Sequence, residues 1–214
     1  QAQQLKLASL GGLTASIAHE IRNPLGAISH AAQLLGESTE LTPPDARLAD
    51  IIQKHSLRMN RVIENVLQLS RRRPTQPERS DLCAWIREFI SEYKSGCATA
   101  CDIELRCQQE PVPFYADHTQ IQQVFHNLVQ NGLRYSEKQT GAASLIINIG
   151  ITLQTQQPFV DIIDRGPGIS PEQADKIFEP FYTSEKTGTG LGLYIARELC
   201  EANQARLDYI PIKS

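Results

Sequence analysis

The sequence of 214 residues has no long apolar run and no excess of basic residues, and each absence excludes a class of protein. No stretch approaches the roughly 18 apolar residues that a membrane helix needs, and no segment resembles a signal peptide. The formal net charge is -3, and the only basic run, Arg71 to Arg73, is more typical of a solvated helix end than of a binding patch, so we expect no nucleic-acid partner. With 41% hydrophobic residues, the chain can nevertheless form the cores of one or two globular domains.

The five cysteines do not form a recognisable framework either. Their odd number and the lack of paired C-x-x-C spacing indicate reduced thiols in a cytosolic setting, without zinc or disulfides. The chain has no initiator Met and begins within a predicted helix, so we expect it to be part of a longer protein.

Residues 4 to 72 predict two long amphipathic helices that form a hairpin. In both halves, seam positions recur at alternating steps of four and three, as in a coiled coil. They are Leu10, Thr14, Ile17, Ile21, Pro24, Ile28, Ala31 and Leu35, and then Leu48, Ile52, His55, Met59, Val62, Val66 and Leu69. Thr42 to Asp45 supplies the N-cap, proline and acidic residue of a helix start. Because two such narrow seams bury little surface alone, we expect two hairpins to pair as a dimeric four-helix bundle.

The periodicity changes after residue 73. A proline-containing stretch at 74–80 predicts a linker, and the remainder, 81–214, predicts a second domain. Helices are expected at 82–94, 118–133 and 191–202, and strands at 102–107, near Phe114, and at 144–152, 159–164 and 206–210. Strands mixed with helices of this length predict an α/β or α+β sandwich.

His19 lies in the stretch SIAHEIRNPLGA, between two isoleucines of the first helix. At about 100° per residue it points away from the seam, so we expect it on the exposed flank. The neighbouring Glu20 can orient one ring nitrogen and accept its proton, which leaves the other nitrogen free to attack. Pro24 removes a backbone hydrogen bond and should loosen or bend the helix. From this stretch alone, a reactive and an inert His19 are equally compatible with the sequence.

Two stretches of the second domain carry polar residues suited to a nucleotide. Asn127 and Asn131 share one helix face, which suits metal and phosphate contacts or, equally, a satisfied polar stripe. Asp164 ends an apolar strand before a Gly-Pro-Gly turn. Its carboxylate can accept a hydrogen bond from an exocyclic amine while the glycines let backbone approach a flat ring, although an ordinary turn has the same pattern.

Two further stretches follow in the chain. The segment from Lys176 to Tyr182 places two aromatic residues around a Glu-Pro pair, and Gly188, Gly190 and Gly192 open a helix. Glycines at a helix start expose backbone N–H groups that bind phosphates, which alone is a weak signal. No Gly-Lys-Ser/Thr follows and no strand precedes, so the segment is neither a P-loop nor a dinucleotide fingerprint.

In this order, the four stretches resemble the N, G1, F and G2 boxes of sensor histidine kinases, and SIAHEIRNPL resembles their H box. The resemblance covers nearly the whole chain. It implies a dimerisation and histidine phosphotransfer hairpin at 1–73, followed by an ATP-binding domain of the gyrase, Hsp90, histidine kinase and MutL type. In that fold, helices cover one face of a mixed sheet. The wording of the H box and the short lid resemble the nitrogen-regulation and type IV pilus sensors.

The resemblance also implies a role for each motif residue. His19 would be the phosphoacceptor, Glu20 the acid/base, and Asn23 the residue that positions water for dephosphorylation of the partner. Asn131 would hold Mg²⁺, and Asp164 would contact the adenine amine. The full set of implied ATP-binding residues is Asn127, Asn131, Arg134, Tyr135, Asp164, Gly166, Gly168, Ile169, Phe178, Phe181, Lys186, Thr187, Gly188, Thr189, Gly190, Leu191, Gly192 and Leu193.

The implied reaction is ATP-dependent autophosphorylation and transfer to an aspartate of a response regulator receiver domain. The chain would be the cytoplasmic portion of an inner-membrane sensor, attached to the membrane through upstream segments. It departs from the family at Asn203-Gln204-Ala205, where a Gly pair is usual, and it stops before the usual last strand. Two alternatives stay open: a non-catalytic ATP-binding scaffold, and another ATPase or serine kinase of the same nucleotide fold.

Overall fold

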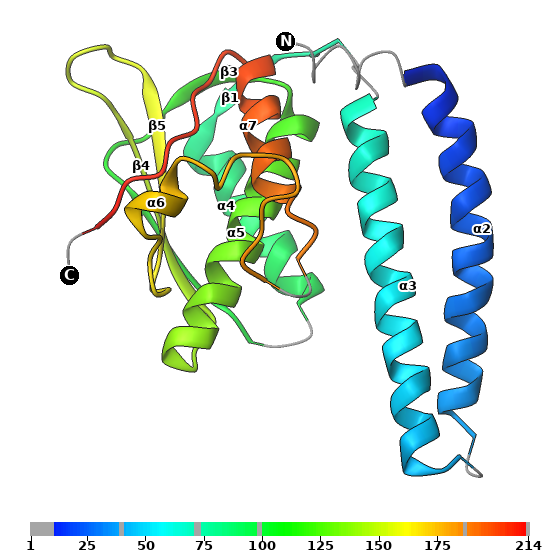
Figure 1. Ribbon diagram of the computed structural model, residues 1–214. Helices are drawn as coiled ribbons and strands as arrows, with labels where there is room; N and C mark the ends of the chain where they lie inside the picture. The colour runs from blue at the N-terminus through cyan, green and yellow to red at the C-terminus, as the bar shows by residue number, and fades with distance from the viewer. Residues whose placement is uncertain (1–10, 39–40, 71–73, 98–99, 186–187, 213–214) are drawn as a thin grey trace. The chain divides into compact units, whose positions relative to one another are not determined.

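The computed structural model describes residues 11–38, 41–70, 74–97, 100–185 and 188–212, without the side chains of 11–19 and 68–70. The chain divides into two compact units, which we describe separately (Figure 1). One unit combines the residues up to Pro74 with Glu179–Leu191, and the other combines Thr75–Phe178 with the residues from Gly192 onward. No helix in the described ranges is long and apolar enough to cross a membrane.

The first unit contains the predicted helical hairpin, formed by α2 (Gly11–Gly36) and α3 (Pro43–Ser70). Helix α3 begins where the sequence predicts, because the Asp45 N–H donates to the Thr42 hydroxyl at 3.4 Å. Helix α2 continues through Pro24. The two helices pack against each other, and Leu25 of α2 and Ala49 of α3 are buried.

The predicted seams lie on the outside of this hairpin. Six side chains on the seam positions are 40 to 57% exposed, namely Ile21, Ile28, Leu35, Leu48, Ile52 and Met59, while Val62 and Val66 are half-buried. The hairpin therefore packs through other positions, and an apolar stripe remains uncovered in the single chain.

The second unit is an α/β sandwich, as predicted. Its elements in chain order are β1 (Glu78–Asp81), α4 (Leu82–Gly96), β2 (Asp102–Cys107), β3 (Pro113–Ala116), α5 (His118–Thr140), β4 (Ser144–Ile151), β5 (Pro158–Asp164), α6 (Pro171–Ala174) and α7 (Gly192–Ala202). Strand β4 lies between β2, to which it is parallel, and β5, to which it is antiparallel. Helices α4 and α5 lie to one side of this mixed sheet, and α7 packs on α5 (Figure 1).

The core forms between the sheet and these helices. Along β4, Leu145, Ile147 and Ile149 are buried at alternate positions, as expected for a strand with one face on the core. They pack with Ile86 of α4 and Val129 of α5, both fully buried. The core therefore fixes α5 against the sheet, and α5 carries four of the predicted nucleotide-binding residues, Asn127, Asn131, Arg134 and Tyr135.

Three sequence-based expectations differ from the structure. Helix α5 extends to Thr140 because its polar last turns are helical and end at Gly141, whose φ of 78° suits a left-handed cap. Part of the predicted linker forms β1, which pairs with β3 although its sequence, ERSD, has no apolar alternation. The strand predicted at 206–210 is wrong, since the segment has no regular structure. Its alternating pattern instead buries part of Tyr209, whose hydroxyl accepts from the Ile169 N–H at 3.1 Å.

Candidate nucleotide-binding site

One face of α5 carries three polar side chains that the sequence predicts to bind nucleotide. Asn127, Asn131 and Arg134 follow at steps of four and three, so they lie on the same side of the helix. All three are half-buried, while Val129 and Leu133 on the other face are in the core. The helix can therefore present polar groups to a ligand without exposing its apolar face.

Arg134 contacts its neighbours Asn131 and Tyr135 on α5, but one of its guanidinium N–H groups has no acceptor among the described residues. Its Nη2 donates to Asn131 Oδ1 at 3.1 Å, and its guanidinium lies 4.9 Å from the centroid of the Tyr135 ring. Its Nε is buried and has no hydrogen-bond partner within the described part of the chain. A buried, charged donor without a partner is costly, and a phosphate oxygen is an acceptor that would satisfy it.

The turn after β5 lies against the same helix. The Gly166 N–H donates to Asp164 Oδ1 at 2.7 Å. A Cβ atom on Gly166 would lie 2.9 Å from the Cβ of Tyr135, a distance that real side chains do not adopt, so only glycine fits here. The structure thus brings Asp164 and Gly166 together with Tyr135, residues that are far apart in the sequence.

Two residues that the sequence analysis did not identify hold this turn in place. Ser136 is fully buried and its hydroxyl accepts from the Arg165 N–H at 2.8 Å. The Tyr209 hydroxyl accepts a hydrogen bond from the Ile169 N–H. Ile169 follows Gly168, whose φ of 73° favours glycine. Nothing in the sequence marks Ser136, which lies in a polar stretch, and the sequence predicts a strand around Tyr209.

The start of α7 also contacts the α5 face. Asn127 Nδ2 donates to the carbonyl oxygen of Gly192 at 3.2 Å, and Leu193 is half-buried beside it in the chain. Phe178 lies under the guanidinium of Arg197, 5.3 Å from its ring centroid. Two of the motifs that the sequence analysis associated, around Asn127 and Gly192, are therefore in direct contact.

The segment between these elements, Glu179–Leu191, belongs to the unit that contains the hairpin. The Phe181 N–H donates to the Gly190 carbonyl at 2.8 Å, and both residues have positive φ, 68° and 70°. Leu191 is fully buried. Within this unit, the carbonyl of Gly188 accepts from Arg58 at 3.0 Å, and the Thr189 hydroxyl accepts from Asn65 at 3.2 Å.

The H-box residues lie on α2. Glu20 and Asn23 are exposed. His19 is part of the helix, but its side chain lies outside the described part of the structure, as do Lys186 and Thr187 as whole residues. The predicted orientation of His19 therefore stays a prediction.

The donor set fits a magnesium nucleotide. The Asn131 side-chain oxygen is a hard ligand of the kind that Mg²⁺ prefers. The unpartnered Arg134 Nε suits a phosphate, and the Asp164 carboxylate at the glycine turn suits an amine-bearing flat ring. Arg134, Asn131 and Asp164 are thus chemically suited to a phosphate, a divalent cation and an amine-bearing base respectively.

Comparison with known protein families matches both units. Residues 9–75 match the His Kinase A (phospho-acceptor) domain, and residues 116–212 match the histidine kinase-, DNA gyrase B- and HSP90-like ATPase domain. Together the two matches cover more than half of the chain.

Among curated proteins, the chain is similar to the sensor protein kinase PilS of Pseudomonas aeruginosa, at 53% identity over 98% of this chain and 39% of PilS. It is 32% identical to the signal transduction histidine-protein kinase AtoS of Escherichia coli K12, over 95% of this chain and 33% of AtoS. The chain thus spans between a third and two fifths of these two relatives.

Among solved structures, the histidine kinase ThkA in complex with the response regulator protein TrrA matches with a TM-score of 0.64 and 28% identity, over 94% of this chain and 57% of that chain. Full-length ShkA in complex with AMPPNP shares the fold at the same TM-score and 22% identity, over 90% of this chain and 41% of ShkA. With both domains matched in the family's order, the chain belongs to the sensor histidine kinases.

Proposed function

We propose that this chain is the catalytic core of a sensor histidine kinase that phosphorylates itself on His19 and passes the phosphoryl group to an aspartate of a response regulator. The observation that carries the proposal is the polar face of α5, where Arg134 has a buried, unpartnered Nε beside Asn131. The 53% identity to PilS supports the same reaction class and a relationship to the pilus sensors.

ATP binds across the α5 face and the turn after β5. Arg134 contacts a phosphate through Nε, and Asp164 accepts a hydrogen bond from the adenine amine beside Gly166. Asn131 ligates Mg²⁺, which supplies charge neutralisation to the phosphates. The glycine segment from Gly188 to Gly192 offers backbone N–H groups of the kind that bind phosphates.

His19 supplies the nucleophile. At neutral pH an imidazole with an ordinary pKa of about 6.5 is mostly neutral, so one ring nitrogen has a free electron pair. That nitrogen forms a bond to the γ-phosphorus, the bond from the phosphorus to the bridging oxygen breaks, and ADP leaves with the electron pair. Glu20 accepts the proton from the other ring nitrogen, and because Glu20 is exposed on α2, the proton can pass on to water.

The protein acts as a homodimer through the hairpin. The exposed seam of Ile21, Ile28, Leu48 and Ile52 is an apolar stripe on a helix pair that buries little surface alone. A second copy of the same stripe covers it in a four-helix bundle.

Asn23, exposed one turn after His19, positions water for dephosphorylation of the regulator. The chain is part of a longer membrane-bound sensor and forms its cytoplasmic portion; it spans 39% of the length of PilS.

The test is labelling with γ-labelled ATP and Mg²⁺. We expect acid-labile label on the protein that disappears in His19→Gln and persists in His30→Gln, which changes an exposed histidine of the same helix. Label that survives in His19→Gln would overturn the assignment of the phosphoacceptor. A longer chain serves as a positive control for the activity of this one.

The same experiment separates the kinase from a non-catalytic scaffold. A scaffold would bind ATP with ordinary affinity and take up no label, whereas a serine kinase of this fold would give acid-stable label. Transfer of the label to an isolated receiver domain then tests the proposed partner class.

A further inference from the structure

A second cluster of ligand-type side chains lies in the α/β unit, apart from the residues of the proposed kinase reaction. The Sγ atoms of Cys83 and Cys107 and a carboxylate oxygen of Glu110 lie within 4.8 Å of one another. Cys83 is in the first turn of α4, Cys107 is the last residue of β2, and Glu110 is in the loop before β3. The sequence predicts no zinc, because the cysteines lack paired C-x-x-C spacing, but the fold brings Cys83 and Cys107 together with Glu110.

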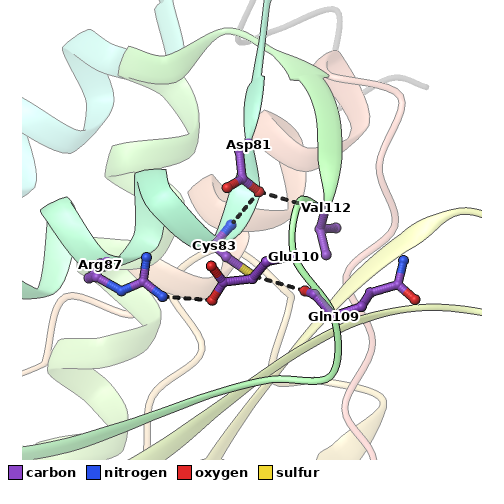
Figure 2. A network of polar contacts seen from close by, with 6 residues as sticks. All are labelled: Asp81, Cys83, Arg87, Gln109, Glu110 and Val112. Atoms are coloured by element: carbon purple, nitrogen blue, oxygen red, sulfur yellow. Dashed lines mark hydrogen bonds and ion pairs between the residues drawn. The ribbon is translucent and has the colours of Figure 1, made fainter.

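The backbone around this cluster is held in place by one carboxylate. Asp81 Oδ1 accepts from the N–H groups of Val112, at 2.8 Å, and Cys83, at 3.3 Å, and so fastens the loop of Glu110 to the start of α4 (Figure 2). The Leu82 N–H adds a bond to the Val112 carbonyl at 2.8 Å. The ligand atoms therefore sit on preorganised segments, which lowers the entropy cost of binding an ion.

Solvent can reach the cluster through a cavity. A cavity of about 280 Å³ is lined by Arg87, Ile90, Ile103, Leu105, Cys107 and Glu110. Cys107 is half-buried and Glu110 is exposed, while Cys83 lies fully buried behind them. An ion can thus enter beside Cys107, and the cavity has room for a water molecule as a further ligand.

The charges of the cluster match a divalent ion. Two thiolates and a carboxylate carry three negative charges. Arg87, whose Nη2 lies 2.7 Å from Glu110 Oε1, supplies one positive charge, and a divalent cation supplies the remaining two. Within this group the bound state would be electrically neutral, which favours a site that is partly removed from water.

The Cys83 thiol is poorly suited to redox chemistry. Burial, together with the neighbouring Cys107, raises the pKa of Cys83 to about 12. The thiolate is the reactive form, so Cys83 is a weak nucleophile at neutral pH. Its proton instead points to the Gln109 carbonyl, with Sγ at 3.6 Å from that oxygen (Figure 2). A bound metal ion displaces such protons directly, because a coordinating thiol is deprotonated.

We propose that Cys83, Cys107 and Glu110 form a binding site for Zn²⁺ on the ATP-binding domain. Zinc accepts thiolate and carboxylate ligands at about 2.3 and 2.1 Å in tetrahedral geometry, which requires ligand atoms about 3.8 Å apart or less. The present separations of up to 4.8 Å need shifts of about 1 Å. Three protein ligands leave the fourth position to water from the cavity. Binding ties the start of α4 to the end of β2 and so stabilises the domain.

The test uses Co²⁺ as a spectroscopic probe and Zn²⁺ as its competitor, with the full chain under reducing conditions. We expect a thiolate-to-cobalt charge-transfer band that one equivalent of Zn²⁺ abolishes, and a rise in the melting temperature with Zn²⁺. Zinc affinity should increase with pH because binding releases thiol protons. Cys107→Ser and Glu110→Gln change accessible ligands and avoid the buried Cys83, and each should weaken zinc binding by about 10-fold or more.

Two control variants define the site. Cys97 and Cys101 form another close pair, with 3.9 Å between their Sγ atoms, and Cys200 is buried elsewhere. Cys101→Ser and Cys200→Ser should retain the band and the zinc-dependent stabilisation. No band in the wild type, a band that survives in Cys107→Ser, or one lost in Cys101→Ser would each overturn the proposal. None of these readouts depends on kinase activity.

Discussion

At the scale of single residues, hydroxyl groups buried in the α/β unit differ in whether they have a partner. Ser136 is fully buried and accepts from the Arg165 N–H, directly after Asp164. The hydroxyl of Ser144, at the start of β4, is also buried and has no hydrogen-bond partner among the described residues. This contrast gives a matched pair of substitutions that isolates the hydrogen bond from the loss of a hydroxyl.

Replacing Ser136 with Ala should lower the free energy of unfolding by about 1–3 kcal/mol, because it leaves the Arg165 N–H unpaired. It should also weaken ATP binding, since the turn that presents Asp164 loses its anchor. Chemical denaturation and calorimetric titration with ATP measure both effects. Ser144→Ala should be neutral or slightly stabilising, and equal losses in the two variants would contradict the role of the Ser136 hydrogen bond.

Asn131 accepts a hydrogen bond from Arg134 and is the predicted ligand of Mg²⁺. Asn131→Ala should reduce autophosphorylation roughly 100-fold or more, because a group that stabilises the charge of the transferred phosphate is lost. The dimer should stay intact by light scattering. Gln130→Ala, at the exposed neighbouring position of α5, is the control, and it should keep full activity. Full labelling in Asn131→Ala would contradict the assignment of Asn131 as a magnesium ligand.

Burial raises the pKa of Cys200 to about 11, compared with about 8.5 for an ordinary thiol. At pH 8 only about one folded molecule in 1000 has this thiolate, so alkylation should be about 200-fold slower than in the unfolded chain. The proton is held more tightly in the folded state. The resulting stability is complete below about pH 8.5 and is lost as the pH rises through 11.

This loss can be measured as the fall in unfolding free energy between pH 8 and pH 11. It should be smaller in Cys200→Ala than in the wild type, where the buried thiol must lose its proton. The same slope in both proteins would show that Cys200 does not contribute to the pH dependence.

At the scale of elements, helix α7 ends in an unusual way. Gln204 has a φ of 58°, a left-handed conformation that favours glycine, and the Ala205 N–H donates back to the Cys200 carbonyl at 2.8 Å. This is the pattern of a Schellman motif with Gln204 at the position that glycine usually holds. The departure from the family's Gly pair noted in the sequence therefore falls on a residue in a strained conformation.

Gln204→Gly should stabilise the α/β unit by about 1 kcal/mol, because glycine adopts the left-handed conformation without the steric cost of a Cβ atom. The unfolding free energy from urea titration tests this. Ala205→Gly is the matched control: its φ is not in the left-handed region, so the added flexibility should be neutral or destabilising. Stabilisation by both variants, or by neither, would argue against strain at Gln204.

The elements with clear apolar periodicity could be predicted from the sequence, and the others could not. Strand β2 lies where its alternation predicts, and α4 and α7 begin within a residue of their predicted starts. Strand β1 could not be predicted, because its sequence, ERSD, is polar and its backbone hydrogen bonds depend on β3, a partner that is distant in sequence. The residues of the α5 face and Asp164 followed from motifs, whereas Ser136 and Tyr209 act through contacts that only the folded chain creates.

At the scale of the whole molecule, the uncovered stripe on the hairpin predicts the oligomeric state. Ile28→Glu or Ile52→Glu should shift the protein from dimer to monomer and raise the dissociation constant at least about 100-fold. Each substitution places a charge in an apolar interface, and the symmetry of the dimer places it there once from each copy. Light scattering or sedimentation measures this. Leu153→Glu changes a side chain that is 92% exposed in a loop of the other unit and should leave the dimer unaffected. A dimer that survives both seam substitutions would place the interface elsewhere.

Helix α5 belongs at once to the core, through Val129 and Leu133, and to the nucleotide-binding face, through Asn127 and Asn131. Its backbone amides at these positions cannot become accessible without disrupting the packing against β4. Hydrogen exchange there should therefore occur only through global unfolding, with a free energy equal to that of the whole domain. ATP should slow this exchange by the same factor by which it raises global stability, so the exchange rate of these amides reports nucleotide affinity without any measurement of catalysis.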